Sequence, residues 1–237
     1  MFSIYSKKKI IVERRNFFES FFSGVLFHGF YLGGVFYSIS IGMPTAIAAL
    51  IVTLQPVLTN ALSGPILNEK VSPKQWVGVL LGFIGATIVL GIDVGKEIPQ
   101  LGLIATIVAL LAITLSTIWQ KKLSNNLPLS VSNFYQAVGG CFFHILIVIF
   151  SAKPYIAFTK TFLLSMGHQI FLVSFGAFTI LMFLIKKNSA SKTVSIFFLI
   201  PATSALMAWF FLEESLTVTD LIGFLIASIG VYIATRD

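Results

Sequence analysis

Few side chains in this sequence could do chemistry inside an apolar environment, and two of them are histidines. His28 and His144 are the ionisable side chains that lie well inside long apolar runs. Because burying a charge in lipid is expensive, such groups are functional candidates, here for a proton or polar relay. The alternative is a neutral imidazole that is packed and hydrogen-bonded. No carboxylate lies deep in an apolar run, so a relay through a buried Asp or Glu is not expected.

Two prolines and one amide form a second group of candidates. Pro56 and Pro201 lie inside apolar runs, where a proline removes a backbone hydrogen bond and bends a helix. Gln55 precedes Pro56 and could hydrogen-bond a substrate or tie two helices together, an interaction worth about 0.6–2 kcal/mol in membranes. Ile200 stands before Pro201, so symmetry does not require the amide, which favours a Gln55 that faces a cavity.

Three aromatic residues and a second amide could line a cavity for amphipathic molecules. Tyr31 lies in the middle of an apolar run, whereas Trp119, Tyr135 and Gln136 lie near the ends of two others. Trp and Tyr at run ends usually belong to the aromatic belt at the membrane interface, and this is the alternative for Trp119 and Tyr135. The candidate substrate-binding residues are therefore Tyr31, Gln55, Pro56, Trp119, Tyr135, Gln136 and Pro201.

Patterns typical of catalysis or metal binding are missing from the sequence. There is no Ser-His-Asp arrangement, no metal-ligand spacing and no phosphate-binding glycine loop followed by Lys. Cys141 is the only cysteine, which excludes an internal disulfide and a thiolate metal cluster. We expect no catalytic residue, no metal, no cofactor and no enzyme activity.

The composition indicates the elements that must hold these candidates. Hydrophobic residues make up 57% of the chain and charged residues only 11%, against about 25% charged in soluble chains. Several apolar runs are long enough to cross a bilayer of about 30 Å, and each must be helical because lipid offers no partner for backbone groups. We predict an all-α polytopic membrane protein with eight spans, near 21–41, 45–67, 76–92, 101–119, 134–150, 166–185, 194–212 and 218–234.

The basic residues predict the orientation of these spans. With eight spans, one side of the membrane holds both termini and the 68–75, 120–131 and 186–193 turns, and it carries thirteen Lys and Arg residues against three on the other side. Because Lys and Arg accumulate on the cytoplasmic side, we expect both termini in the cytoplasm. The same placement explains the net charge of +7 without a nucleic-acid partner.

The chain repeats itself at a spacing of 145 residues. Pro56 lies 145 residues before Pro201, and the same spacing relates Glu69 to Glu214, Gly78 to Gly223 and Gly85 to Gly230. The second span thus matches the seventh, five crossings later, so the two copies must face opposite ways. Inverted repeats, and broken helices at matching positions within them, point to a transport site between the copies.

The repeat also predicts a truncated first copy. Shifted by 145 residues, Met1 falls opposite Leu146, near the end of the fifth predicted span. Residues 101–145 then have no counterpart in the first copy. We expect an inverted repeat of five-helix units in a ten-helix parent, with the first unit reduced here to three helices.

Small residues and acidic turns have structural interpretations. Gly78, Gly82 and Gly85, and their counterparts Gly223 and Gly230, form faces on which helix backbones can approach closely. Glu69, in the turn after the second span, is expected to stabilise the N-terminal turn of the helix that follows it.

The repeated pattern resembles the EamA-like family of the drug/metabolite transporter superfamily. It consists of an apolar helix with a proline in the middle, an L-x-E turn and a glycine-punctuated helix. The residues that carry the likeness are Leu54-Gln55-Pro56, Leu67-Asn68-Glu69, Gln75-Trp76-Val77-Gly78 and Gly85, and then Leu199-Ile200-Pro201, Leu212-Glu213-Glu214, Gly223 and Gly230. The resemblance implies a ten-helix secondary transporter or exporter of small metabolites.

These observations divide the chain into three parts. We predict a cytoplasmic basic segment at 1–16, a partial first repeat of three helices at 17–92 and a complete second repeat of five helices at 100–237. The expected function is a secondary transporter, an exporter or exchanger of small organic metabolites, in the bacterial inner membrane. The alternative is a non-transporting remnant or helper with the same fold, and a homodimer is left open.

Overall fold

Eight helical spans confirm the predicted membrane fold. The computed structural model describes residues 12–91, 97–151, 156–213 and 215–236, which contain helices, turns and loops but no strand. Within these residues, eight helical stretches are long and apolar enough to cross a membrane. They are Arg14–Ser40, Thr45–Leu67, Pro73–Leu90, Gln100–Ser124, Leu129–Phe150, Lys160–Lys187, Ala190–Phe211 and Val218–Thr235. The predicted basic segment at 1–16 lies mostly outside the described residues, and its last three residues form the first turn of the first span.

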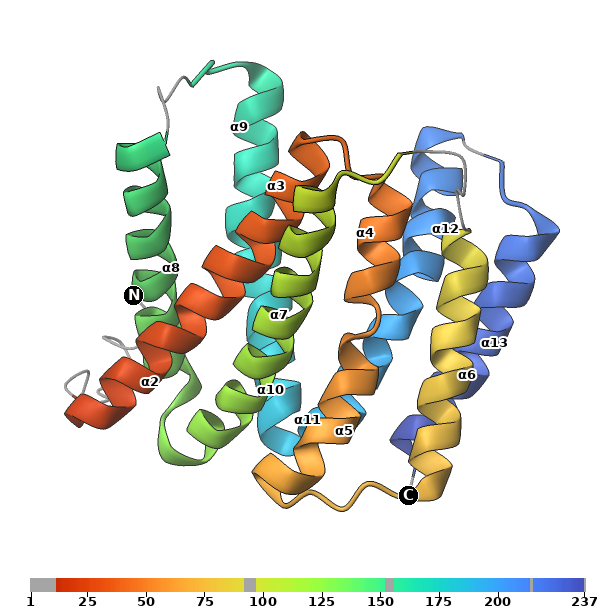
Figure 1. The fold of residues 1–237 in the computed structure, drawn as a ribbon, viewed down its shortest axis with the longest axis horizontal. Coiled ribbons are helices and arrows are strands. Elements are labelled where there is room, and N and C mark those ends of the chain that lie inside the picture. The colour runs from red at the N-terminus through yellow and green to blue at the C-terminus, as the bar shows by residue number, and fades with distance from the viewer. Residues whose placement is uncertain (1–11, 92–96, 152–155, 214, 237) are drawn as a thin grey trace.

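Four of these spans are continuous α-helices. They are α6 (Pro73–Leu90), α7 (Gln100–Asn126), α8 (Leu129–Ser151) and α13 (Val218–Thr235). Figure 1 shows α6 and α13 side by side at one edge of the molecule and α8 at the opposite edge, with α7 between them. The α5–α6 loop, the α10–α11 turn and the C-terminus lie at one end of the molecule, the lower end in Figure 1.

The other four spans are interrupted within the predicted membrane region. The first consists of α2 (Arg14–Gly24), a π-helical segment η1 (Val25–Gly33) and α3 (Gly34–Ser40). The sixth is built the same way from α9 (Lys160–Gly167), the π-helical η2 (His168–Ala177) and α10 (Phe178–Lys187). The second consists of α4 (Thr45–Val52) and α5 (Gln55–Leu67), and the seventh of α11 (Ala190–Ser195), a 3-10 turn η3 (Ile196–Leu199) and α12 (Ile200–Leu212).

Pro56 and Pro201 explain two of the interruptions. Each proline lies in the first turn of the second helical piece of its span, α5 or α12. Because proline has no N–H and its ring clashes with the carbonyl four residues earlier, an uninterrupted α-helix cannot pass through it. The chain tightens instead: Leu54 N donates to Ile51 O at 3.1 Å, a bond that spans three residues rather than four. The bends expected at these prolines are therefore present.

The repeat spacing recurs in the element boundaries. α5 and α12 both have 13 residues and α6 and α13 both have 18, and each boundary of the later helix falls 145 residues after that of the earlier one. Asn68 and Glu213, also 145 residues apart, end α5 and α12 in the left-handed conformation with φ of 56° and 57°. These matches support the predicted repeat at the level of backbone geometry.

The glycine faces bring α6 and α13 into direct backbone contact. A Cβ added at Gly78 would lie 2.6 Å from the Gly230 carbonyl oxygen, and one added at Gly85 would lie 2.7 Å from that of Gly223. The low-numbered glycine of one helix thus meets the high-numbered glycine of the other, so the two helices run antiparallel. Val79, Ala86, Phe198, Val231 and Ala234 pack around this contact as a buried cluster.

We predict that Gly85→Ala destabilises the chain by about 1–3 kcal/mol, because the obstructing atoms belong to the backbone of α13 and cannot rotate away. The midpoint of thermal unfolding in detergent measures the effect. Gly167→Ala is the matched control: its Cβ would meet nothing within 4 Å, and alanine favours a helix over glycine by about 1 kcal/mol. Equal melting of the two variants would contradict the tight contact.

Candidate functional site

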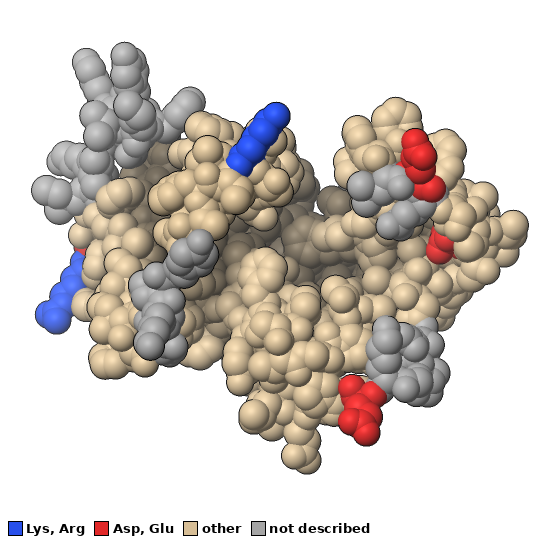
Figure 2. All heavy atoms as spheres, turned by 90° about the horizontal axis from the view of Figure 1, so that it is seen from above, with Lys and Arg blue, Asp and Glu red and all other residues tan. Residues whose placement is uncertain are grey.

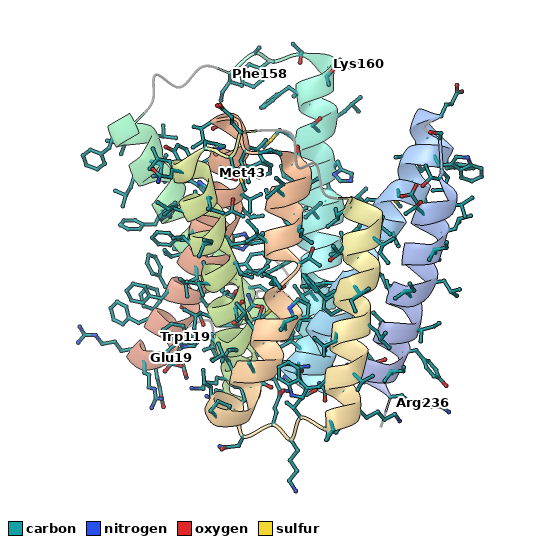
Figure 3. The ribbon with its side chains drawn as sticks, turned by 45° about the vertical axis from the view of Figure 1, so that its right-hand side comes forward. Glu19, Met43, Trp119, Phe158, Lys160 and Arg236 are labelled. Atoms are coloured by element: carbon teal, nitrogen blue, oxygen red, sulfur yellow. The ribbon has the colours of Figure 1, made fainter. Side chains whose placement is uncertain are left out.

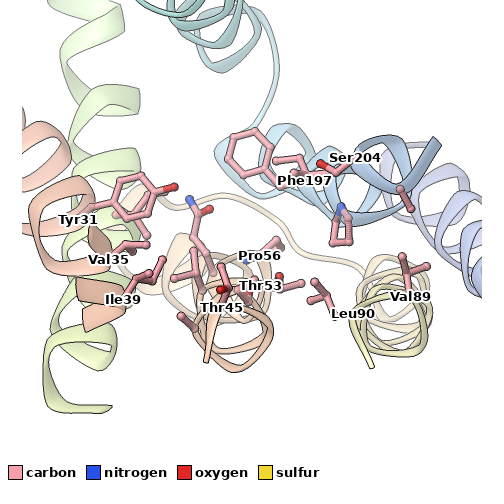
Figure 4. A pocket seen from close by; sticks show the side chains of 18 of the residues that line it. Tyr31, Val35, Ile39, Thr45, Thr53, Pro56, Val89, Leu90, Phe197 and Ser204 are labelled. Atoms are coloured by element: carbon pink, nitrogen blue, oxygen red, sulfur yellow. Dashed lines mark hydrogen bonds between the residues drawn. The ribbon is translucent and has the colours of Figure 1, made fainter. Parts of the chain in front are cut away.

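A cavity of about 530 Å³ lies between the interrupted spans. Figure 4 shows Tyr31, Val35 and Ile39 on one side of it and Phe197 and Ser204 facing them from the other. Its lining also includes Val89 and Leu90 of α6 and Ile113 of α7, so the first, second, third, fourth and seventh spans take part. The complete lining is Phe27, Tyr31, Val35, Ile39, Thr45, Ala48, Ala49, Val52, Thr53, Gln55, Pro56, Val89, Leu90, Ile113, Phe197, Ile200, Pro201, Ser204 and Ala205.

The cavity extends to one end of the molecule. Ile39, Thr45 and Leu90 lie at the ends of α3, α4 and α6, which is the upper end in Figure 1. Seen from above, the surface there is hollowed between two groups of helices (Figure 2). Volumes of about 300–1,000 Å³ are typical of sites for small molecules, so the cavity can hold a metabolite.

Four of the predicted substrate-binding residues line this cavity. Tyr31, Gln55, Pro56 and Pro201 come from three interrupted spans and meet at it. Gln55 is 2% exposed, and its Nε2 donates to Thr117 Oγ1 at 3.0 Å. The hydroxyl of Thr117 in turn donates to the Ile113 carbonyl at 2.9 Å. Gln55 thus both faces the cavity and ties α5 to α7.

Trp119, Tyr135 and Gln136 lie outside the cavity. Trp119 is half-buried on α7, toward the end of the molecule that carries Glu19 (Figure 3). Tyr135 of α8 packs edge-on against Phe17, with ring centroids 5.1 Å apart. Gln136 is fully buried between α7 and α8, where its Oε1 accepts from Gln120 at 3.2 Å and its Nε2 donates to Ser132 at 3.0 Å. None of the three lines this cavity, because both α8 side chains face neighbouring helices.

His28 and His144 pair with each other and not with the cavity. The Nε2 of His144 lies 3.0 Å from the carbonyl oxygen of His28. The His28 ring packs against Phe27 and Phe178, at centroid distances of 5.0 and 5.2 Å. Neither histidine is among the lining residues, so the geometry favours a packed His28 ring and a hydrogen-bonded His144 ring over a relay that opens into the cavity.

A buried polar cluster fills the interior beside the α5–α6 loop. It consists of Asn60, Glu69, Gln75 and Ser191, and we refer to it as the polar cluster. Gln75 Nε2 donates to Asn60 Oδ1 at 3.0 Å and to Ser191 Oγ at 2.8 Å, which links α5, α6 and α11. Asn60, Gln75 and Ser191 are at most 4% exposed. The cavity is therefore closed toward this end.

Charged side chains hold both sides of the α10–α11 turn at the same end. Glu69 accepts from the backbone N–H of Ala190 at 2.8 Å and of Ser191 at 3.4 Å, at the start of α11. Lys121 of α7 donates to the carbonyl of Ile185 at 2.9 Å and to that of Asn188, where α10 ends. Each charge suits the partial charge of the helix end that it contacts.

The contact of Glu69 corrects one expectation and exposes residues that the sequence did not single out. Glu69 stabilises the start of α11, in the other half of the chain, while Ser72 caps the following helix α6 by accepting from Gln75 N at 3.1 Å. Thr117 and Ser191 carry hydroxyls on predicted membrane spans, and nothing local in the sequence marks their partners.

Comparison with known proteins places this arrangement in a family. The sequence profile described as "EamA-like transporter family" matches residues 1–91 and 100–236. The chain belongs to the EamA-like transporter family. The resemblance expected from the repeated motifs is thereby confirmed.

Relatives of this EamA-like chain are transporters or efflux pumps. It is 27% identical over 212 residues to "Uncharacterized transporter YvbV" of Bacillus subtilis, covering 85% of this chain and 65% of that protein. It is 24% identical over 210 residues to "Probable amino-acid metabolite efflux pump" of Salmonella typhimurium, covering 84% and 70%. A solved structure titled "Crystal structure of protein" aligns with a TM-score of 0.80 at 15% identity over 98% of this chain and 81% of that one, which shows the fold.

We predict that Glu69→Gln lowers the stability of the chain by about 0.5–2 kcal/mol, because the neutral amide retains the cap only in part and loses its charge interaction with the helix end. Thermal unfolding in detergent measures the loss. Glu97→Gln makes the same change at an exposed residue and is the control. A Glu69→Gln variant that melts with the control would show that the cap contributes nothing.

Proposed function

We propose that this chain carries small organic metabolites across the cytoplasmic membrane as a secondary transporter, an exporter or exchanger, and is not an enzyme. The observation that carries the proposal is the cavity, because it lies where the proline-interrupted spans of the two repeats meet. Interrupted helices at matching positions of two repeats are the arrangement in which transporters place their substrate. The printed descriptions of the relatives as transporters and efflux pumps support the same class.

Alternating access then works between the two ends of the cavity. The described conformation is open toward the ends of α3, α4 and α6 and closed by the polar cluster and the α10–α11 turn. In our proposal the open end faces outward, since the closed end carries Lys70, Lys121, Lys122, Lys186 and Lys187, and basic residues gather in the cytoplasm. The opposite state requires the polar cluster to separate while the outer ends of the spans approach each other.

The proposed inversion of the repeats has a direct test. In a Cys141→Ser background, we expect Ser215→Cys to react with a membrane-impermeant maleimide added to intact cells, because the α12–α13 loop faces outward. Lys70→Cys, in the α5–α6 loop, should react only after the membrane is permeabilised. Both positions are exposed in the structure, so lack of access cannot mimic protection. Labelling of both from the same side would refute the inversion.

Transport itself depends on Gln55 in this proposal. We expect the chain, reconstituted in liposomes loaded with a mixture of small metabolites, to release a subset of them faster than empty liposomes, as measured by mass spectrometry. Gln55→Ala should reduce that release about tenfold, the effect of one lost hydrogen bond of about 1.4 kcal/mol.

Gln100→Ala is the control, since Gln100 is an exposed glutamine at the start of α7. Unchanged release by the Gln55→Ala variant would remove Gln55 from the site. Absence of release for every compound would favour the non-transporting helper.

A further inference from the structure

We infer that the cavity selects uncharged molecules that carry a hydrogen-bond donor on a largely apolar body, and that Thr117 sets this preference by orienting Gln55. The inference rests on the proposed transport function for its biological meaning. Its physical basis is separate, because it concerns which group Gln55 presents to a ligand. Thr117 does not line the cavity, so it is a positioning residue.

In the described arrangement Thr117 accepts a hydrogen bond from Gln55. A threonine hydroxyl has one hydrogen, and that of Thr117 goes to the Ile113 carbonyl at 2.9 Å. With that bond in place, the group that lies 3.0 Å from Thr117 Oγ1 donates to it, and this is the Nε2 of Gln55. Turning the amide over would lose one hydrogen bond, because the single Thr117 hydrogen cannot serve both Oε1 and the Ile113 carbonyl, so α7 favours this direction of the amide.

The consequence is that Gln55 presents its oxygen to the cavity. Gln55 Oε1 accepts no hydrogen bond within the described part of the chain, and it is not among the buried polar atoms that are shut off without a partner. Since Gln55 lines the cavity, Oε1 is the acceptor that its amide offers to a ligand. An acceptor left unpaired after a ligand has displaced water costs about 1–3 kcal/mol. A ligand that brings an N–H or O–H group avoids this cost.

A second fixed acceptor lies on the same span. Thr53 lines the cavity, and its hydroxyl donates to the Ala49 carbonyl at 2.7 Å, so while this bond is kept its oxygen accepts from a ligand. Tyr31 and Ser204 carry hydroxyls that can turn to donate or accept. The groups whose orientation is set by a hydrogen bond within the protein, the Gln55 amide and the Thr53 hydroxyl, thus favour ligands with donors.

Charge is the other criterion of selection. Among the described lining residues there is no Asp, Glu, Lys, Arg or His, and most are aliphatic or aromatic. An ion that enters such a cavity gives up hydration and finds no opposite charge, which is strongly unfavourable. We therefore expect neutral molecules to bind and anions or cations of the same shape to be rejected.

Indole and benzofuran test the donor preference, because they share shape and size while only indole has an N–H group. We expect the purified chain in nanodiscs to bind indole about tenfold more tightly than benzofuran in equilibrium dialysis. Thr117→Val, which keeps the side-chain shape but frees the amide to turn, should reduce this ratio to within about twofold. Thr117→Ser should restore it.

Thr114→Val is the matched control. Thr114 is a buried threonine of α7 whose hydroxyl donates to the Leu110 carbonyl at 2.7 Å, and it does not line the cavity. Thr114→Val should leave the ratio of indole to benzofuran affinity unchanged.

If Thr117→Val fails to fold, Gln55→Leu tests the donor preference, since without the amide the two probes should bind equally. Indole-3-acetate, an anion at pH 7, should bind at least tenfold more weakly than indole.

The inference is overturned if wild-type protein binds benzofuran as tightly as indole, if neither probe binds, if the anion binds as well as indole, or if the ratio survives both Thr117→Val and Gln55→Leu. Its failure can be told apart from that of the proposed function. If the chain prefers indole but releases no metabolite from liposomes, the inferred selectivity stands and the proposed transport function is wrong. If it releases metabolites but shows no preference for a donor, the transport function stands and the inferred selectivity is wrong.

Discussion

The constraint on which the structure depends is that backbone N–H and C=O groups inside a membrane must find partners within the protein. An interrupted helix is tolerated at membrane depth only where protein or a cavity surrounds it. In this chain η1, the break before Pro56 and the 3-10 turn η3 contribute Tyr31, Gln55 and Phe197 to one cavity. The π-helical η2 of the sixth span contributes no residue to this cavity, so three of the four interrupted spans supply it. At these three places the interruption coincides with the cavity in which we propose that a ligand binds.

Most of the spans and several of their irregularities could be predicted from the sequence because their causes are local. Apolar length gives a span, Pro56 and Pro201 give a break, and Gly78 with Gly85 gives a face on which another helix can lie closely. The eight spans are present as expected. The repeat spacing, which needs only the comparison of one half with the other, reappears in the bounds of α5 and α12.

The hydrogen-bond partners of these side chains, and the directions in which the side chains point, could not be predicted from the sequence, because both arise from packing between distant segments. Gln55 and Thr117 are 62 residues apart and Glu69 and Ala190 are 121 apart, and no local pattern connects them. For Trp119, Tyr135 and Gln136 the sequence indicates only their depth, which suits both a cavity wall and, for the two aromatic residues, the interfacial belt. Helices that are apolar on every side carry little information about which face meets protein and which meets lipid, so depth could not supply direction. The π-helical segments likewise contain no proline from which the interruption could be predicted.

The backbone contact between α6 and α13 limits how the molecule can move. Where side chains separate two helices, they can change rotamer and let one helix slide past the other, but at Gly78 and Gly85 main chain lies directly against main chain. We therefore expect α6 and α13 to move together as one rigid pair. Val89 and Leu90, at the tip of α6, form part of the rim of the cavity. A tilt of this pair would carry the rim with it and change the width of the entrance while the contact between the two helices stays unchanged.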